Sequence, residues 1–171
     1  MFDNIKQSIP EIAKDIRLNL GKVLDLSQND GLTEGQILGS ALAVAYSLAD
    51  KELVRALEEV ITDETLVKAA QLAASLMAMT NIYYRFTHLT ENPEVEHVPA
   101  GLRMQGMMNP GVDRMTFETL SLAVSALNGC GTCISSHTRQ LQEQGFSATA
   151  IARIGRISAV IHAVVVSRRL V

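Results

Sequence analysis

The two cysteines of the chain lie three positions apart, within the stretch LNGCGTCISSH. Cys130 and Cys133 form a C-x-x-C motif, and His137 follows four residues after the second cysteine. Two isolated core cysteines would have no reason to fall this close together, so a chemical use is considered first. In an intracellular protein, such a motif is more often catalytic or metal-binding than a structural cross-link.

The environment expected for these cysteines favours reactivity. Asn128 and Gly129 are typical of a helix end, so the cysteines are expected in the first turn of a new helix. The unpaired N–H groups and the positive dipole end of a helix stabilise an anion, so thiolates form more easily there. The two sulfurs lie on the same side of that turn and can close a small disulfide. His137 lies one turn beyond Cys133 on the same face, where its imidazole can accept the thiol proton.

Two other interpretations of the motif stay open at this point. The cysteines can be small apolar core residues beside an ordinary polar histidine. They can also bind zinc together with His137, although a structural zinc site needs four ligands and the chain has no second C-x-x-C motif.

A carboxylate is expected to join the histidine. If the helices before and after Asn128 pack as an antiparallel hairpin, Glu118 lies about 15 Å back from the turn and His137 about 10 Å back. The difference is about one helical turn, which their side chains can bridge. Glu118 is also surrounded by apolar or small residues in FETLSLAVSAL, and a carboxylate on a mostly buried helix usually has a partner. The alternative is an exposed glutamate near a helix start.

The elements that position these residues are expected to be helices throughout. Alanine and leucine recur at three- and four-residue spacing, and only 4% of the residues are aromatic, so the sequence predicts an all-α fold. Helices are expected over residues 10–24, 33–49, 62–86, 113–127, 130–145 and 147–170, with a further one through Leu53, Leu57 and Val60. Prolines and glycines predict a long connection over residues 91–111, with one short turn near 104–108. Thr62 or Asp63, Asp113 and Ser147 are the expected N-caps.

The length fits one domain, and we expect a single domain over residues 1–171. Within it, LAVAYSLADKELVRAL from Leu42 lines up with LAVSALNGCGTCISSHTRQL from Leu122. Each stretch is followed by a capped helix that ends in Arg85 or Arg169. A duplicated helical unit is one interpretation of this similarity. The first copy lacks cysteine, so only the second would carry the chemistry.

The composition narrows the range of partners. With 47% hydrophobic and 19% charged residues the chain is globular, and a net charge of -3 without a basic cluster argues against binding to nucleic acid or an anionic membrane. The first twenty residues lack the apolar core of a signal peptide, and the apolar run at 159–166 is too short to span a bilayer. We therefore expect a cytoplasmic protein without membrane contact.

The sequence resembles the AhpD-type alkyl hydroperoxide reductases of the carboxymuconolactone decarboxylase-like superfamily. The resemblance covers nearly the whole chain and is sharpest from NPGVD at Asn109 through FETLSLAVSALNGCGTC to SSHTRQLQEQG. Glu118, Cys130, Cys133 and His137 occupy the positions of the family's glutamate, C-x-x-C and histidine. Thr132 stands between the cysteines, where relatives often have a histidine or an aromatic residue. This departure concerns a second imidazole and not the dithiol.

The resemblance implies an all-α protein, commonly a homotrimer, that reduces alkyl hydroperoxides, H2O2 and peroxynitrite without haem, flavin, metal or any other tightly bound cofactor. It implies catalysis by Cys133, which forms the sulfenic acid, Cys130, which resolves it to a disulfide, His137 and Glu118. It also implies dihydrolipoamide as electron donor, carried by the lipoylated E2 subunit of a 2-oxoacid dehydrogenase, and an AhpC-type peroxiredoxin as partner. The alternatives are a dithiol–disulfide adaptor with little peroxidase activity and a non-enzymatic redox-sensing interaction protein.

Overall fold

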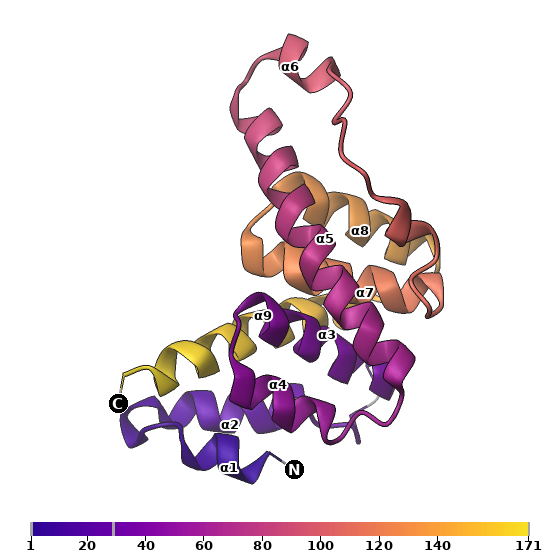
Figure 1. Cartoon of the computed structure of the whole chain (residues 1–171). Helices are drawn as coiled ribbons and strands as arrows, with labels where there is room; N and C mark the ends of the chain where they lie inside the picture. The colour runs from indigo at the N-terminus through magenta and orange to yellow at the C-terminus, as the bar shows by residue number, and fades with distance from the viewer. Residues whose placement is uncertain (1, 29, 171) are drawn as a thin grey trace.

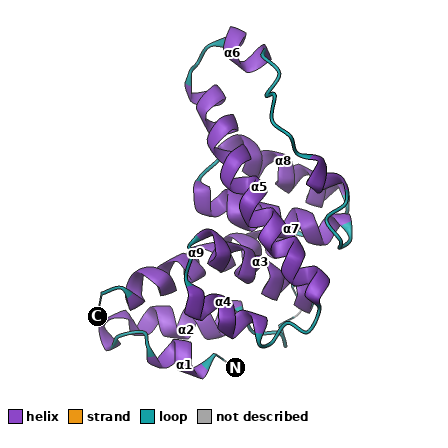
Figure 2. Cartoon of the chain, in the orientation of Figure 1, coloured by secondary structure: helices purple, strands orange, loops and turns teal. Residues whose placement is uncertain are grey.

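A computed structural model describes residues 2–28 and 30–170, and in these ranges the chain forms helices and connections without a strand (Figure 2). The α-helices are α1 Asp3–Gln7, α2 Lys14–Val23, α3 Glu34–Ser47, α4 Lys51–Glu58, α5 Glu64–Leu89, α6 Pro93–His97, α7 Arg114–Asn128, α8 Gly131–Glu143 and α9 Ala148–Arg168. Two 3₁₀ turns, η1 Glu11–Ala13 and η2 Gln105–Met108, complete the order. The predicted all-α fold is confirmed.

The helix starts follow the capping side chains named from the sequence. Asp63 caps α5, Asp113 caps α7 and Ser147 caps α9, each accepting a hydrogen bond from a backbone N–H of the first turn. Thr33 caps α3 in a reciprocal capping box with Gln36. Capping was predictable because a short polar side chain satisfies N–H groups that the helix itself leaves unpaired.

Two short helices were not predicted. One is α1, and the other is α6, which lies inside the segment expected to be a connection. The sequence predicts a break at Pro93, but this proline occupies the first turn of α6, where a missing N–H costs nothing. Asn92 caps that turn by accepting from the backbone N–H of Glu94.

Six of the described helices form two units of three consecutive helices each, α3–α4–α5 and α7–α8–α9 (Figure 1). In the first unit the chain turns at Ala49, with φ 55°, and in the second at Gly129, with φ 66°. The next residue caps the following helix in both cases, Asp50 through its carboxylate and Cys130 through its sulfur. These shared features align the two units residue by residue around the turn.

The third helix of each unit reaches across to the turn of the other. Arg85, at the C-terminal part of α5, donates to the backbone carbonyl of Asn128 at the end of α7. Arg169 directly follows α9 and donates to the carbonyl of Leu48 at the end of α3, at 3.4 Å. The two arginines, which end the two similar stretches of sequence, therefore make equivalent contacts.

The centre of the molecule is the packing of α3 against α7, with α5 and α9 touching both. Every residue from 36 to 45 and from 116 to 125 is buried. Helices that are apolar or small around the whole circumference belong in a core. The helix that carries Glu118, α7, is therefore held in place by its packing against α3, α5 and α9.

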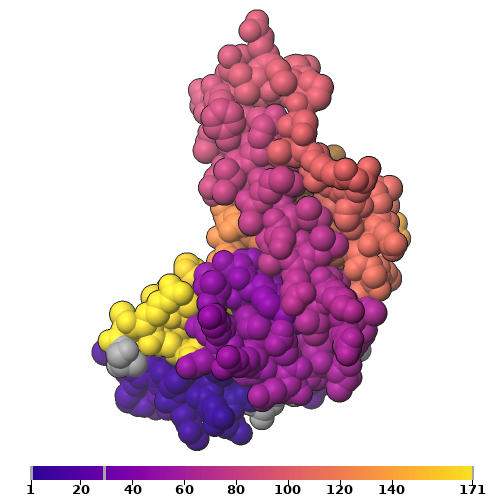
Figure 3. Space-filling view, viewed as in Figure 1, coloured from indigo at the N-terminus to yellow at the C-terminus, as the bar shows by residue number. Residues whose placement is uncertain are grey.

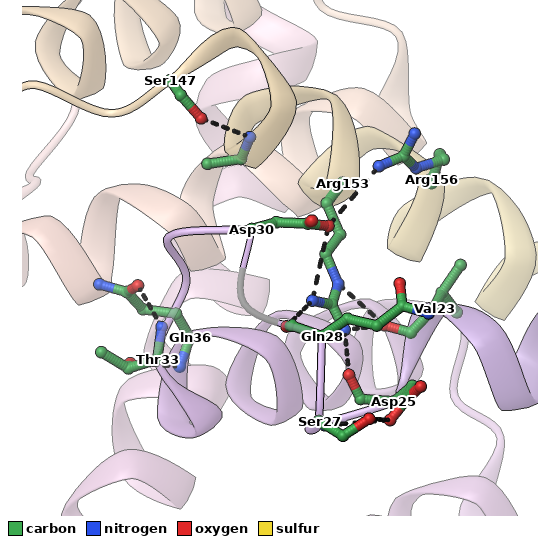
Figure 4. Close-up of polar contacts among 11 residues, drawn as sticks. Val23, Asp25, Ser27, Gln28, Asp30, Thr33, Gln36, Ser147, Arg153 and Arg156 are labelled. Carbon is green, nitrogen blue, oxygen red and sulfur yellow. Dashed lines mark hydrogen bonds and ion pairs between the residues drawn. The ribbon is translucent and has the colours of Figure 1, made fainter.

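Arg153 ties the start of the chain to α9 (Figure 4). Its side chain is almost fully buried, and its guanidinium donates to the carbonyls of Val23, Asp25 and Gln28 at distances between 2.6 and 3.3 Å. The carboxylate of Asp30 lies 3.6 Å away. One guanidinium thus satisfies one carbonyl at the end of α2 and two in the connection that follows it.

Among the described residues, only α9 is long and apolar enough to span a membrane by length and composition. In the structure 44% of its most apolar 18-residue stretch is buried, and α9 packs against α2, α3 and α7. It is a core helix of the fold.

The C-terminal half of α5 and the short α6 project from the body of the molecule (Figures 1 and 3). This projection, which we call the α5 arm, exposes Ile82, Phe86 and Leu89, each more than half accessible to solvent. Single exposed apolar residues are common on protein surfaces, but three within two turns of one helix form a patch.

Candidate active site

The C-x-x-C motif lies at the start of α8. Cys130 is the N-cap, and its sulfur accepts a hydrogen bond from the backbone N–H of Cys133 at 3.3 Å. The Cα atoms are 5.3 Å apart, and the two sulfurs are joined as a disulfide. Cys130 is completely buried, whereas Cys133 keeps a small exposed fraction. The cysteine that an incoming molecule can reach is therefore Cys133.

The buried pair of Glu118 and His137 lies beside this motif. Nδ1 of His137, on α8, is 2.6 Å from Oε2 of Glu118, on α7, and both side chains are less than 10% exposed. The meeting predicted by counting residues along the hairpin is confirmed. A carboxylate at Nδ1 fixes the orientation of the imidazole and leaves Nε2 for proton exchange in the pocket that His137 shares with Cys133.

The start of α7 supports the position of Glu118. Thr116 donates to Asp113 from its hydroxyl at 2.6 Å and from its backbone N–H at 2.9 Å. Burial opposes ionisation of Asp113, but these hydrogen bonds outweigh it and lower the pKa of Asp113. The cap is therefore charged at neutral pH and stabilises the first turn of the helix that carries Glu118.

Arg114 is a residue of the site that was not singled out from the sequence. Its Nε lies 4.0 Å from Oε1 of Glu118, one turn away on α7, and its guanidinium donates to the side-chain carbonyl of Gln140 on α8. The side chain is 76% exposed, so the ion pair is screened by solvent and contributes little. The i, i+4 spacing of Arg114 and Glu118 was the signal that could have identified it.

A cavity of about 300 Å³ opens beside Cys133. Its walls come from α5, α8 and the segment around η2, and they are formed by Met77, Thr80, Tyr84, Met104, Met107, Thr132, Cys133, Ser136, His137 and Gln140. The three methionines and the tyrosine ring supply apolar wall, while Cys133 and His137 bring a sulfur and an imidazole to the same cavity. This cavity, which we call the cysteine pocket, suits a small molecule with an apolar body and one reactive end.

A second cavity, of about 540 Å³, borders the cysteine pocket. Met104, Met107 and Gln140 line both cavities, and the second one extends to Arg114 and Glu118. Two methionines of the segment around η2, Met104 and Met107, thus form part of the wall of both cavities.

The first unit has none of this chemistry at the equivalent positions. Asp50 takes the place of Cys130, and Leu53 and Leu57 take the places of Cys133 and His137. Both leucines are fully buried. Across the part of the chain that the structure describes, no three His, Cys, Asp or Glu side chains gather as metal ligands would.

Comparison with known proteins points to the same second unit, which carries the cysteines and the histidine. The model of the "Carboxymuconolactone decarboxylase family" matches residues 93–170, which contain the whole second unit and all four predicted site residues. The chain is 46% identical over 165 residues to alkyl hydroperoxide reductase AhpD of Coxiella burnetii (strain RSA 493 / Nine Mile phase I), covering 95% of this chain and 93% of the relative.

Two further relatives carry the same name. Alkyl hydroperoxide reductase AhpD of Rhodospirillum centenum is 44% identical over 95% of this chain and 88% of its own length. That of Bradyrhizobium sp. (strain BTAi1) is 44% identical over 97% of this chain and 92% of its own length. The chain belongs to the AhpD-type alkyl hydroperoxide reductases. As a member of this family it is an enzyme of the oxidoreductase class.

Proposed function

We propose that the protein reduces organic hydroperoxides with Cys133 as the attacking thiolate. The observation that carries this proposal is that Cys133 shares a mainly apolar pocket with His137, whose Nδ1 is held by the buried Glu118. The apolar wall accommodates the alkyl group, and the thiolate attacks the terminal oxygen of the peroxide. The O–O bond breaks, Cys133 becomes a sulfenic acid, and the alkoxide leaves.

His137 supplies the proton for the departing alkoxide. It first takes the proton of the Cys133 thiol and then returns it to the oxygen that leaves, so the reaction ends with a neutral alcohol. Glu118 stabilises the imidazolium that exists between these two steps. Because both side chains are buried, this stabilisation is weakened little by solvent.

Cys130 completes the oxidative half of the cycle. Its thiolate attacks the sulfur of the Cys133 sulfenic acid, the S–O bond breaks, and hydroxide leaves with a proton as water. The disulfide in the structure corresponds to the product of this step. Cys130, as the completely buried member of the pair, is shielded from peroxide and suited to resolving rather than attacking.

The disulfide is then re-reduced by a dihydrolipoyl group, whose two thiols give up two electrons and two protons and close to the lipoyl disulfide. The resemblance to AhpD-type enzymes supports this donor, together with the lipoylated E2 subunit that carries it and an AhpC-type peroxiredoxin as a redox partner. The second cavity, which shares three residues with the cysteine pocket, offers space for a slender arm.

The assembly we propose is a homotrimer in the cytoplasm, where reductants keep the resting dithiol open. Ile82, Phe86 and Leu89 on the α5 arm support subunit contacts, because an isolated chain leaves these three side chains in water.

Stopped-flow oxidation of the pre-reduced protein by tert-butyl hydroperoxide tests the proposed function. A peroxidase is oxidised rapidly and turns over when dihydrolipoamide is added. Slow oxidation combined with rapid reduction of a peroxiredoxin disulfide would instead show an adaptor. A protein that is oxidised but never cycles would be a sensor, and either of these results would contradict the peroxidase.

A further inference from the structure

A buried polar network connects α5 to the turn that carries the cysteines. The side-chain amide of Asn81 donates to Ser125 Oγ at 3.0 Å, and the amide of Asn128 donates to Asn81 Oδ1 at 3.0 Å. Asn81 and Ser125 are completely buried. Asn128 is the last residue of α7, two positions before Cys130, so the network ends at the cysteine turn.

The same network reaches the wall of the cysteine pocket. Both Asn81 and Ser125 lie within hydrogen-bonding distance of the sulfur of Met77, at 3.7 and 3.6 Å. Met77 lines the cysteine pocket. Asn81 therefore uses its carbonyl and its amide group together, one toward the cysteine turn and the other toward the pocket wall. A buried side chain with all its polar groups satisfied is held in one orientation.

The first unit provides an internal comparison. Asn81 lies four residues before Arg85, and Val165 lies four residues before Arg169, so Val165 is its counterpart. The turn comparison pairs Asn128 with Leu48 and Ser125 with Ala45. Ala45 and Val165 are fully buried, and the arginine contact to the turn is present in both units. At the turn of the first unit, which has no cysteines, apolar side chains thus suffice to pack the turn against α9.

We infer that Asn81 is a positioning residue, acting with Ser125 and Asn128 to hold Cys130 in place for its attack on Cys133. The inference rests on the proposed roles of the two cysteines. The network fixes the turn from Asn128 to Cys130, and a fixed turn raises the effective concentration of one sulfur at the other. The step that depends on it is closure of the disulfide, in which the S–O bond of the sulfenic acid breaks and water leaves.

The test uses the triple variant Asn81→Val, Ser125→Ala, Asn128→Leu. It replaces the three polar side chains by the apolar ones found at the equivalent turn of the first unit. Exchanging all the polar partners for apolar groups removes the contacts without leaving one of them unpaired. The control is Ser121→Ala. Ser121 lies on α7, as Ser125 and Asn128 do, is fully buried, and its hydroxyl has no hydrogen-bond partner among the described residues. Asn128→Ala, at a half-buried helix end, is the second variant if the triple variant does not fold.

Two readouts are measured on each protein. In equilibrium with dithiothreitol, the triple variant is expected to shift about tenfold toward the dithiol, or about 30 mV, while Ser121→Ala matches the wild type. In a single turnover with tert-butyl hydroperoxide, sulfenic acid formation is expected within about twofold of the wild-type rate. Disulfide closure is expected to be about tenfold slower, with more sulfinic acid formed. Asn128→Ala should shift both readouts in the same direction by a smaller factor.

The two readouts separate this inference from the proposed function. A wild-type protein that fails to react with peroxide would contradict the proposed function. The dithiothreitol equilibrium needs no peroxide, so it would still test the positioning role of Asn81. Wild-type equilibrium and wild-type closure in the variants would overturn the role of Asn81.

Discussion

Glu118 and His137 are joined across two helices by a contact of 2.6 Å between Oε2 and Nδ1. The contact exists because α7 and α8 form a tight hairpin around Gly129, which takes the left-handed conformation that a glycine adopts without strain. On the same helix as His137, one turn earlier, is Cys133. A carboxylate, an imidazole and the sulfur of Cys133 therefore follow one another in the order that the proposed activation of the nucleophile requires.

The two cysteines are expected to respond differently to substitution. Cys130→Ser should consume one equivalent of hydroperoxide and stop at a sulfenic acid on Cys133, because only the resolving thiol is lost. Cys133→Ser should consume none, since Cys130 is completely buried. Trapping with a sulfenic-acid reagent, followed by mass spectrometry, measures both. Equal labelling of the two variants would contradict the assigned roles.

Arg153 is expected to stabilise the fold without taking part in the chemistry. Arg153→Met leaves three backbone carbonyls without their donor and should lower the free energy of unfolding by about 3 kcal/mol. For a chain of this size, that corresponds to a melting temperature lower by roughly 6–12 °C. Thermal unfolding at fixed protein concentration measures it. Arg156→Met is the control, because that side chain is 57% exposed and 3.9 Å from Asp30. Equal melting temperatures for the two variants would be the contrary result.

The α5 arm is expected to lie between subunits. Sedimentation at micromolar concentration should give roughly three times the chain mass of 18.6 kDa. Phe86→Glu should lower that mass, because it places a charge where apolar side chains meet. Ile12→Glu, at an even more exposed isoleucine of η1, should leave it unchanged. A wild-type monomer would exclude the trimer, and a trimeric Phe86→Glu variant would place the interface elsewhere.

The parts of the site that could be predicted from the sequence depend on local rules. The rise per residue of a helix is constant, so the meeting of Glu118 with His137 followed from counting residues, and the N-caps followed from side-chain chemistry. Other contacts join residues far apart in the chain, such as Asn81 with Asn128, and Arg153 with Gln28 in the connection after α2. No periodicity marks such pairs, because helix packing creates them only after the chain has folded.

The measurement that tests the proposed mechanism most directly is the single-turnover rate of peroxide reduction by Glu118→Gln across about pH 6 to 10. An ordinary thiol is only about 3% thiolate near pH 7, so a pair that merely ionised Cys133 could raise the rate by at most roughly 30-fold. Proton donation to the alkoxide adds about 100-fold or more. His137→Ala is measured in parallel, with Glu143→Gln as a control at an exposed position of α8.

Glu118→Gln and His137→Ala are both expected to be slowed by more than roughly 30-fold near pH 7 and to recover only in part near pH 9.5. The thiolate returns at high pH, but the proton donor does not. Full recovery at high pH would reduce the pair to a device for ionising Cys133, and wild-type rates near pH 7 would contradict its place in the mechanism.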